Sequence, residues 1–133
     1  PAAGRKTRNK GKIKNKAMTT VELIKSIAFD FGWTVSTDED EDTVVFDFRY
    51  YTKHGLDYGF CAELTGNKFG GFLGEVERNC EDFDPDYEAY RWIGHDGHGK
   101  CGAPYHIKDI VDEMEEAKRL FTDFYNSLKT ALT

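Results

Sequence analysis

Side chains that can bind a metal ion or act as nucleophiles gather in one glycine-rich stretch, residues 92–106. His95, His98 and Cys101 follow one another at three-residue spacing, and His106 comes five residues later. Imidazole nitrogen and thiolate sulfur are ligands that zinc accepts in tetrahedral protein sites. One hypothesis is therefore a zinc site formed by His95, His98, Cys101 and His106.

The same stretch also fits a purely structural role. Structural zinc sites usually place pairs of ligands on short turns joined by a longer span, whereas here all four candidates crowd one loop. Glycine permits backbone angles that other residues resist, so this composition is typical of a tight connection. We favour a connector that leads an aromatic segment into the last helix. The residues expected to set its path are Gly97, His98, Gly99, Gly102, Pro104 and Tyr105.

Two kinds of catalysis at this stretch are weaker hypotheses. Residues 94–100 have the spacing of a phosphate-binding loop, but Cys101 stands where Ser or Thr would bind magnesium, and Pro104 intervenes before the helix. Cys101 is also near three histidines, although nearness in sequence does not orient a nucleophile and its base. The sequence therefore favours a protein that is not an enzyme, with a catalytic or metal-binding loop as the alternative.

Charge is divided into two blocks along the chain. Residues 1–17 contain seven Lys or Arg residues and no acid. The remaining residues, 18–133, hold 11 basic and 24 acidic residues, a net charge of -13, although the whole chain carries only -6. An acidic body repels the phosphates of nucleic acids and suits a basic protein surface.

Acidic residues are densest at the start of the last predicted helix. Residues three or four positions apart lie on the same face of a helix. We predict that this face forms a binding surface for a protein partner with a basic surface. Its residues are Asp109, Asp112, Glu113 and Glu116.

Length and composition predict one acidic domain at residues 18–133, because 133 residues suffice for a single core. Residues 1–17 have one large apolar residue, Ile13, and are expected to be a disordered arm or a leader. Nucleic-acid binding by their lysines is a further alternative.

Three widely spaced cysteines predict reduced thiols in the cytoplasm, and no apolar run reaches the ~18 residues of a membrane helix.

Hydrophobic periodicity predicts an α+β fold. Phe46, Phe48 and Tyr50 alternate with polar residues, as a half-buried strand requires. Thr19 and Glu22 have the spacing of a capping box, which marks the start of the first helix. The expected helices cover 19–31, 72–82 and 107–128, and the expected strands cover 33–37, 43–52 and 58–64.

These elements suggest a three-stranded antiparallel meander packed against two or three helices. The acidic run 38–42 is expected to be the turn of the first hairpin. A short aromatic strand at 90–93 would add a fourth strand, and we leave that choice between three and four strands open.

Two sequence segments resemble small uncharacterised proteins of gut bacteria and of their phages or mobile elements. The first contains Phe83, Asp84, Tyr87-Glu88-Ala89-Tyr90 and Trp92, and the second reads Gly97-His98-Gly99-Lys100-x-Gly102-Ala103-Pro104-Tyr105. The resemblance implies a genomic context and no activity. In that pattern an amide often replaces Cys101 and an acid replaces His95, which weighs against zinc and thiol chemistry.

Taken together, the sequence predicts a non-enzymatic protein-binding module of a bacterium, phage or mobile element. An acidic decoy or counter-defence protein is one form of this hypothesis. The alternatives are a small metal-binding or catalytic domain that uses the His95–His106 loop, and nucleic-acid binding through residues 1–17.

Overall fold

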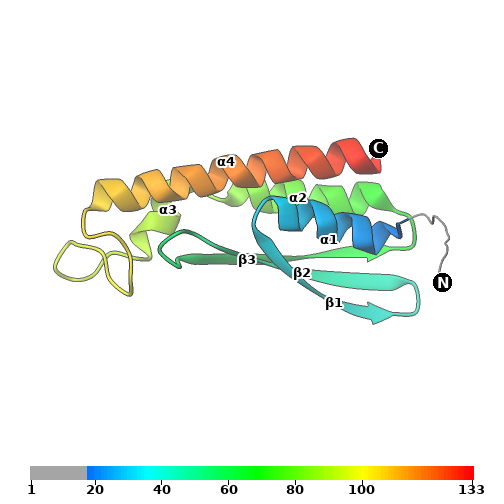
Figure 1. Cartoon of the computed structure of the whole chain (residues 1–133), viewed down its shortest axis with the longest axis horizontal. Coiled ribbons are helices and arrows are strands. Elements are labelled where there is room, and N and C mark those ends of the chain that lie inside the picture. The colour runs from blue at the N-terminus through cyan, green and yellow to red at the C-terminus, as the bar shows by residue number, and fades with distance from the viewer. Residues whose placement is uncertain (1–17) are drawn as a thin grey trace, which may run out of the picture.

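The computed structural model describes residues 18–133, so the predicted basic arm, residues 1–17, lies outside the described residues. A helix, three strands and three further helices follow one another along the chain (Figure 1). Their bounds are α1 Thr20–Asp30, β1 Trp33–Asp40, β2 Thr43–Tyr51, β3 Asp57–Thr65, α2 Phe69–Asp82, α3 Pro85–Tyr90 and α4 Ile107–Leu132.

The three strands form one antiparallel sheet in the order β1-β2-β3, which confirms the predicted α+β class and meander. Val35 lies opposite Phe48, and Phe48 lies opposite Phe60, so alternate side chains of all three strands share one face. Helices α1, α2 and α4 cover this face (Figure 1).

The core between sheet and helices is built from aromatic rings. The ring of Trp33 lies 5.1 Å from that of Phe121 and 5.4 Å from those of Phe60 and Phe124. Phe121 also stacks on Phe60, with ring centroids 5.1 Å apart. Such rings bury large apolar areas and gain further energy from edge and offset contacts, so they join β1 and β3 to α4.

Local sequence signals fix the ends of α1. The Thr19 side chain accepts a hydrogen bond from the Glu22 amide at 3.1 Å, and the Glu22 carboxylate accepts one from the Thr19 amide at 3.1 Å. This is the predicted capping box. Gly32 has a φ of 88°, a left-handed conformation that ends the helix and turns the chain into β1.

The acidic run was wrongly expected to be a turn throughout. β1 continues to Asp40, which lies opposite Thr43, and only Glu41 and Asp42 form the turn. Backbone pairing with β2 extends through the acidic residues because their side chains are exposed and remain hydrated on both faces.

The fourth strand at 90–93 is also wrong. Residues 85–90 form the short helix α3, and Ile93 makes only an isolated bridge to Gly99. Asp84 accepts a hydrogen bond from the Asp86 amide at 3.0 Å, and Pro85 stands at the first helical position. This combination of cap and proline starts a helix and outweighs the aromatic residues that suggested a strand.

The two long helices run beyond their predicted bounds and are joined at one end. α2 starts at Phe69 rather than Phe72, and α4 continues to Leu132. The Lys118 ammonium group of α4 donates to the Phe83 carbonyl at 2.9 Å and to the Cys80 carbonyl, at the end of α2. None of the helices in residues 18–133 is both long and apolar enough to span a membrane.

Replacing Phe121 should destabilise the fold far more than replacing Phe29. Phe121 is 1% exposed and Phe29 is 78% exposed. We expect Phe121→Ala to lower the free energy of unfolding by about 3–5 kcal/mol, because it leaves a cavity among rings. Phe29→Ala should change it by less than about 0.5 kcal/mol. Urea denaturation followed by tryptophan fluorescence measures both, and equal losses would contradict this description of the core.

Candidate functional site

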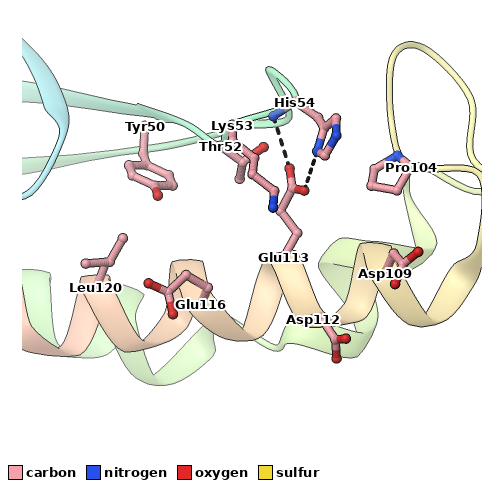
Figure 2. Close-up of a pocket in the computed structure, with 10 residues that line it drawn as sticks. All are labelled: Tyr50, Thr52, Lys53, His54, Pro104, Asp109, Asp112, Glu113, Glu116 and Leu120. Atoms are coloured by element: carbon pink, nitrogen blue, oxygen red, sulfur yellow. Dashed lines mark hydrogen bonds and ion pairs between the residues drawn. The ribbon is translucent and has the colours of Figure 1, made fainter.

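A hollow lies between the acidic side of α4 and the loop that joins β2 to β3 (Figure 2). It has a volume of about 630 Å³, and we call it the α4 groove. Three separate segments form its walls: the end of β2 with the following loop, the glycine-rich connection, and α4. The residues are Tyr50, Thr52, Lys53, His54, Pro104, Asp109, Asp112, Glu113, Glu116 and Leu120.

All four acidic residues predicted as a binding surface line this one groove. Their spacing of three or four residues places them along one side of α4, as the helical repeat requires. Asp109, Asp112 and Glu116 are exposed. Glu113 corrects the prediction, because it is only 8% exposed and belongs to the floor of the groove rather than to an open surface.

The Glu113 carboxylate holds the β2–β3 loop against α4. One oxygen lies 2.6 Å from Nδ1 of His54, and the other accepts a hydrogen bond from the His54 backbone amide at 3.3 Å (Figure 2). The Thr52 hydroxyl donates to the same carboxylate and accepts a bond from the Leu56 amide at 3.0 Å. A single buried side chain thus joins segments 59 residues apart in sequence.

Burial raises the pKa of Glu113, but the hydrogen bonds from Thr52 and His54 outweigh it, and the pKa lies below its ordinary value. The carboxylate is therefore ionised at neutral pH. Because hydrogen bonds to a charged acceptor are about twice as strong as neutral ones, this contact is well suited to fix the loop.

The rim carboxylates differ in the partners they already have. Asp112 binds Lys108 at 2.9 Å, and Glu116 binds Arg119 through two contacts at 2.5 and 3.1 Å. Asp109 has no ion-pair partner among residues 18–133. The rim therefore offers one free carboxylate and two whose pairs are exposed to solvent.

The Tyr50 ring lines the end of the groove that lies away from Pro104 (Figure 2). Burial first, and then the nearby carboxylates of Glu116 and Glu113, raise the pKa of its phenol group. Burial is the main cause of this shift, and the negative charges of the two carboxylates act in the same direction because they disfavour a phenolate.

The glycine-rich connection forms a wall of the groove rather than a centre of reactive groups. Pro104 lines the groove, and a Cβ atom placed on Gly102 would lie 3.6 Å from the His54 carbonyl oxygen. The connection is cross-linked by backbone hydrogen bonds, among them Gly99 to Tyr105 at 3.0 Å and Lys100 to the Trp92 carbonyl at 2.9 Å. It is thus a folded loop that packs beside the β2–β3 loop.

The structure does not bring His95, His98, Cys101 and His106 together. No group of three or more His, Cys, Asp or Glu residues in the described part of the chain is arranged to hold a metal ion. His98 instead stacks on Tyr105, with ring centroids 3.9 Å apart and planes inclined by 13°. Cys101 is exposed and does not line the α4 groove.

Sequence reasoning missed the wall opposite α4, which Tyr50, Thr52, Lys53 and His54 supply. The sequence predicts only the end of a strand at residue 52 and the connection to the next strand at residue 58 for this part of the chain. A histidine beside a lysine in a short loop carries no distinctive spacing, so only the folded structure reveals its contact with Glu113.

Comparison of the chain with models of protein families, with curated proteins and with solved structures gives no match. The site is therefore interpreted from its own geometry, as a small acidic groove with one buried anchoring carboxylate and three exposed ones.

Removing the Glu113 charge should lower the free energy of unfolding and make it depend less on pH. A carboxyl group whose pKa is lowered by folding stabilises the folded state at pH values above its pKa in the unfolded chain. That contribution is lost as the pH falls through the lowered pKa. We expect Glu113→Gln to cost about 1–3 kcal/mol at neutral pH and to reduce the stability change between about pH 6 and pH 3.

Urea denaturation at several pH values measures this effect, and Glu115→Gln is the control. Glu115 is exposed and lies two residues further along α4. If both variants show the same pH profile, the His54–Glu113 contact does not fix the loop.

Adding a methyl group at Gly99 should disturb the groove wall. Its Cβ atom would lie 1.8 Å from the Pro104 carbonyl oxygen, so the backbone must move. We expect Gly99→Ala to destabilise the chain by about 1–3 kcal/mol. Gly70→Ala is the matched control, because nothing lies within 4 Å and alanine favours the helix by about 0.5–1 kcal/mol. Thermal unfolding would contradict this account if the two variants had the same midpoint.

Proposed function

We propose that this protein is a non-enzymatic protein-binding module whose α4 groove receives a basic segment of a partner. The observation that carries the proposal is the gathering of four carboxylates from one side of α4 around a single groove. Grooves of this size lie within the ~300–1,000 Å³ range of sites that take compact ligands or side chains.

The electrostatics favour a cationic ligand. Residues 18–133 carry a formal net charge of -13, and the basic residues that line the groove are Lys53 and His54. Carboxylates at the rim of a concave surface attract and orient positive side chains, which increases the rate of association.

The existing ion pairs at the rim are easy to exchange. The side chains of Lys108 and Asp112 are 82% and 53% exposed, and ion pairs so exposed to solvent contribute little to stability. When a lysine or arginine of the partner displaces Lys108 from Asp112, little free energy is therefore lost with the Lys108–Asp112 ion pair. Asp109 is available without any exchange.

Apolar surface in the groove suits the stem of a long basic side chain. Tyr50, Leu120 and Pro104 line the groove beside the carboxylates. Lysine and arginine bury their methylene groups against such surfaces, and a guanidinium group binds the face of an aromatic ring. An arginine-containing segment therefore matches both the charge and the shape of the site.

Binding is favoured over catalysis because no cysteine, serine or second histidine lines the groove among the described residues. Its threonine hydroxyl is already used by Glu113 and the Leu56 amide. A decoy that occupies the nucleic-acid-binding surface of a host protein remains our prediction for the biological role. Origin in a phage or mobile element also remains a prediction.

The test is binding of a fluorescein-labelled peptide of alternating arginine and glycine, followed by fluorescence anisotropy. We expect the dissociation constant to rise at least about tenfold when NaCl increases from about 50 to about 500 mM. The triple variant Asp109→Asn, Asp112→Asn, Glu116→Gln should weaken binding at low salt by at least about tenfold.

The control has the same change in net charge at exposed positions away from the groove, Asp30→Asn, Glu81→Gln and Asp82→Asn. It should bind the peptide almost as well as the unmodified chain. Equal losses in the two triple variants would mean that overall charge, and not the α4 groove, attracts the peptide. Affinity capture from host lysate with the same three proteins then identifies the natural partner.

A further inference from the structure

β1 presents a second surface that the α4 groove does not involve. It is an edge strand that pairs only with β2, so one side of its eight-residue backbone has no strand beside it in the described sheet. Edge strands are protected from further pairing by proline, by a bulge or by charged side chains, most often lysine. β1 contains no proline or lysine, and its register with β2 is continuous from Trp33 to Asp40. Its charged residues, Asp38–Asp40, are all negative, so they oppose a second acidic chain but not a basic segment.

An apolar groove follows the first half of this edge. It lies between α1 and β1, has a volume of about 440 Å³, and is lined in part by Phe29, Trp33 and Val35. Phe29 is 78% exposed, the highest value among the large apolar side chains described. An occupant of this groove can supply an apolar side chain that packs beside Phe29 and Val35.

The second half of the edge is acidic. Residues 33–37 carry no charge, whereas Asp38, Glu39 and Asp40 follow in the same strand and Glu41 and Asp42 form the turn. All five acidic side chains are exposed, and none has an ion-pair partner among residues 18–133. The edge thus changes along its length from an apolar to a negatively charged surface.

We propose that the β1 edge binds an extended segment of a protein partner by adding a strand, with basic side chains at one end and apolar side chains at the other. Backbone hydrogen bonds give such complexes their affinity, and side-chain pockets at alternate positions give them specificity. Charge complementarity with residues 38–42 selects a basic segment over a second copy of this acidic domain.

The order of side chains in the partner follows from the register. An antiparallel strand matches the existing sheet and pairs slightly more stably than a parallel one. Its first residues then lie opposite Asp40 and Asp38, and its last residues lie opposite Val35 and Trp33. The preferred segment therefore has lysine or arginine first, followed by apolar residues at alternate positions that face α1.

This inference does not rest on the proposed function, because the β1 edge and the α4 groove share no residue. The probe is the labelled peptide Lys-Lys-Lys-Thr-Thr-Ile-Thr-Ile, and its control is the same sequence reversed. Binding to the full chain is measured by fluorescence anisotropy. We expect the reversed peptide to bind at least about tenfold more weakly.

Backbone pairing is tested with two further peptides that carry N-methyl groups on alternate amides, one in each phase. Methylation of the amides that face β1 should abolish binding, and methylation of the other phase should not. Phe29→Ala should weaken binding at least about fivefold, and so should Asp38→Asn with Asp40→Asn. The triple variant of the α4 groove should leave the binding of this peptide within about twofold.

Several results would overturn the proposal. Equal binding of the forward, reversed and methylated peptides would show general attraction to an acidic domain. Loss of binding only in the α4-groove variant would place the peptide in that groove. Failure of the forward peptide to bind, or sedimentation showing a dimer that Phe29→Ala converts to monomer, would also overturn it, the latter by making the edge a contact between copies.

Discussion

The contact between Glu113 and His54 fixes the β2–β3 loop against α4 on the side of the molecule that bears the α4 groove. The aromatic core joins the sheet to the helices, and Leu56 of the β2–β3 loop is buried in the same apolar core, whereas the loop at His54 is held to α4 by a polar contact. Glu113 provides it with two hydrogen bonds to one residue, a third from Thr52, and a charge that remains ionised at neutral pH. Among residues 18–133, the hydrogen bonds that join the β2–β3 loop to α4 are those of Glu113.

The same contact divides the acidic residues of α4 into two roles. Glu113 is buried and satisfied by the protein, so its charge contributes to the potential of the groove without being offered to a ligand. Asp109, Asp112 and Glu116 surround it at the rim, where exposed charges affect association rate and salt dependence more than final affinity. The folded glycine-rich loop adds Pro104 as a third, apolar wall.

Much of the fold could be predicted from the sequence, because alternation at Phe46 and Phe48 and the capping box at Thr19 are local signals. The errors arose where two local signals competed, as at Pro85, where a helix start outweighed a run of aromatic residues.

The site was only half predictable. Helical spacing indicated the acidic side of α4, but no periodicity links Glu113 to His54 across 59 residues. The metal hypothesis depended on residue types at short spacing, and the backbone path through Gly97, Cys101 and Gly102, all with positive φ, decides their separation.

The most direct test of the central claim is to locate the bound ligand. Titration of the ¹⁵N-labelled chain with the arginine–glycine peptide can be followed by amide chemical shifts. We predict that the largest changes fall at residues 50–54, at the amides flanking Pro104, and at 109–120, with His54 among the most affected. Changes spread evenly over the acidic turn at 41–42 and other charged surfaces, or confined to residues 95–101, would contradict the claim that the α4 groove is the binding site.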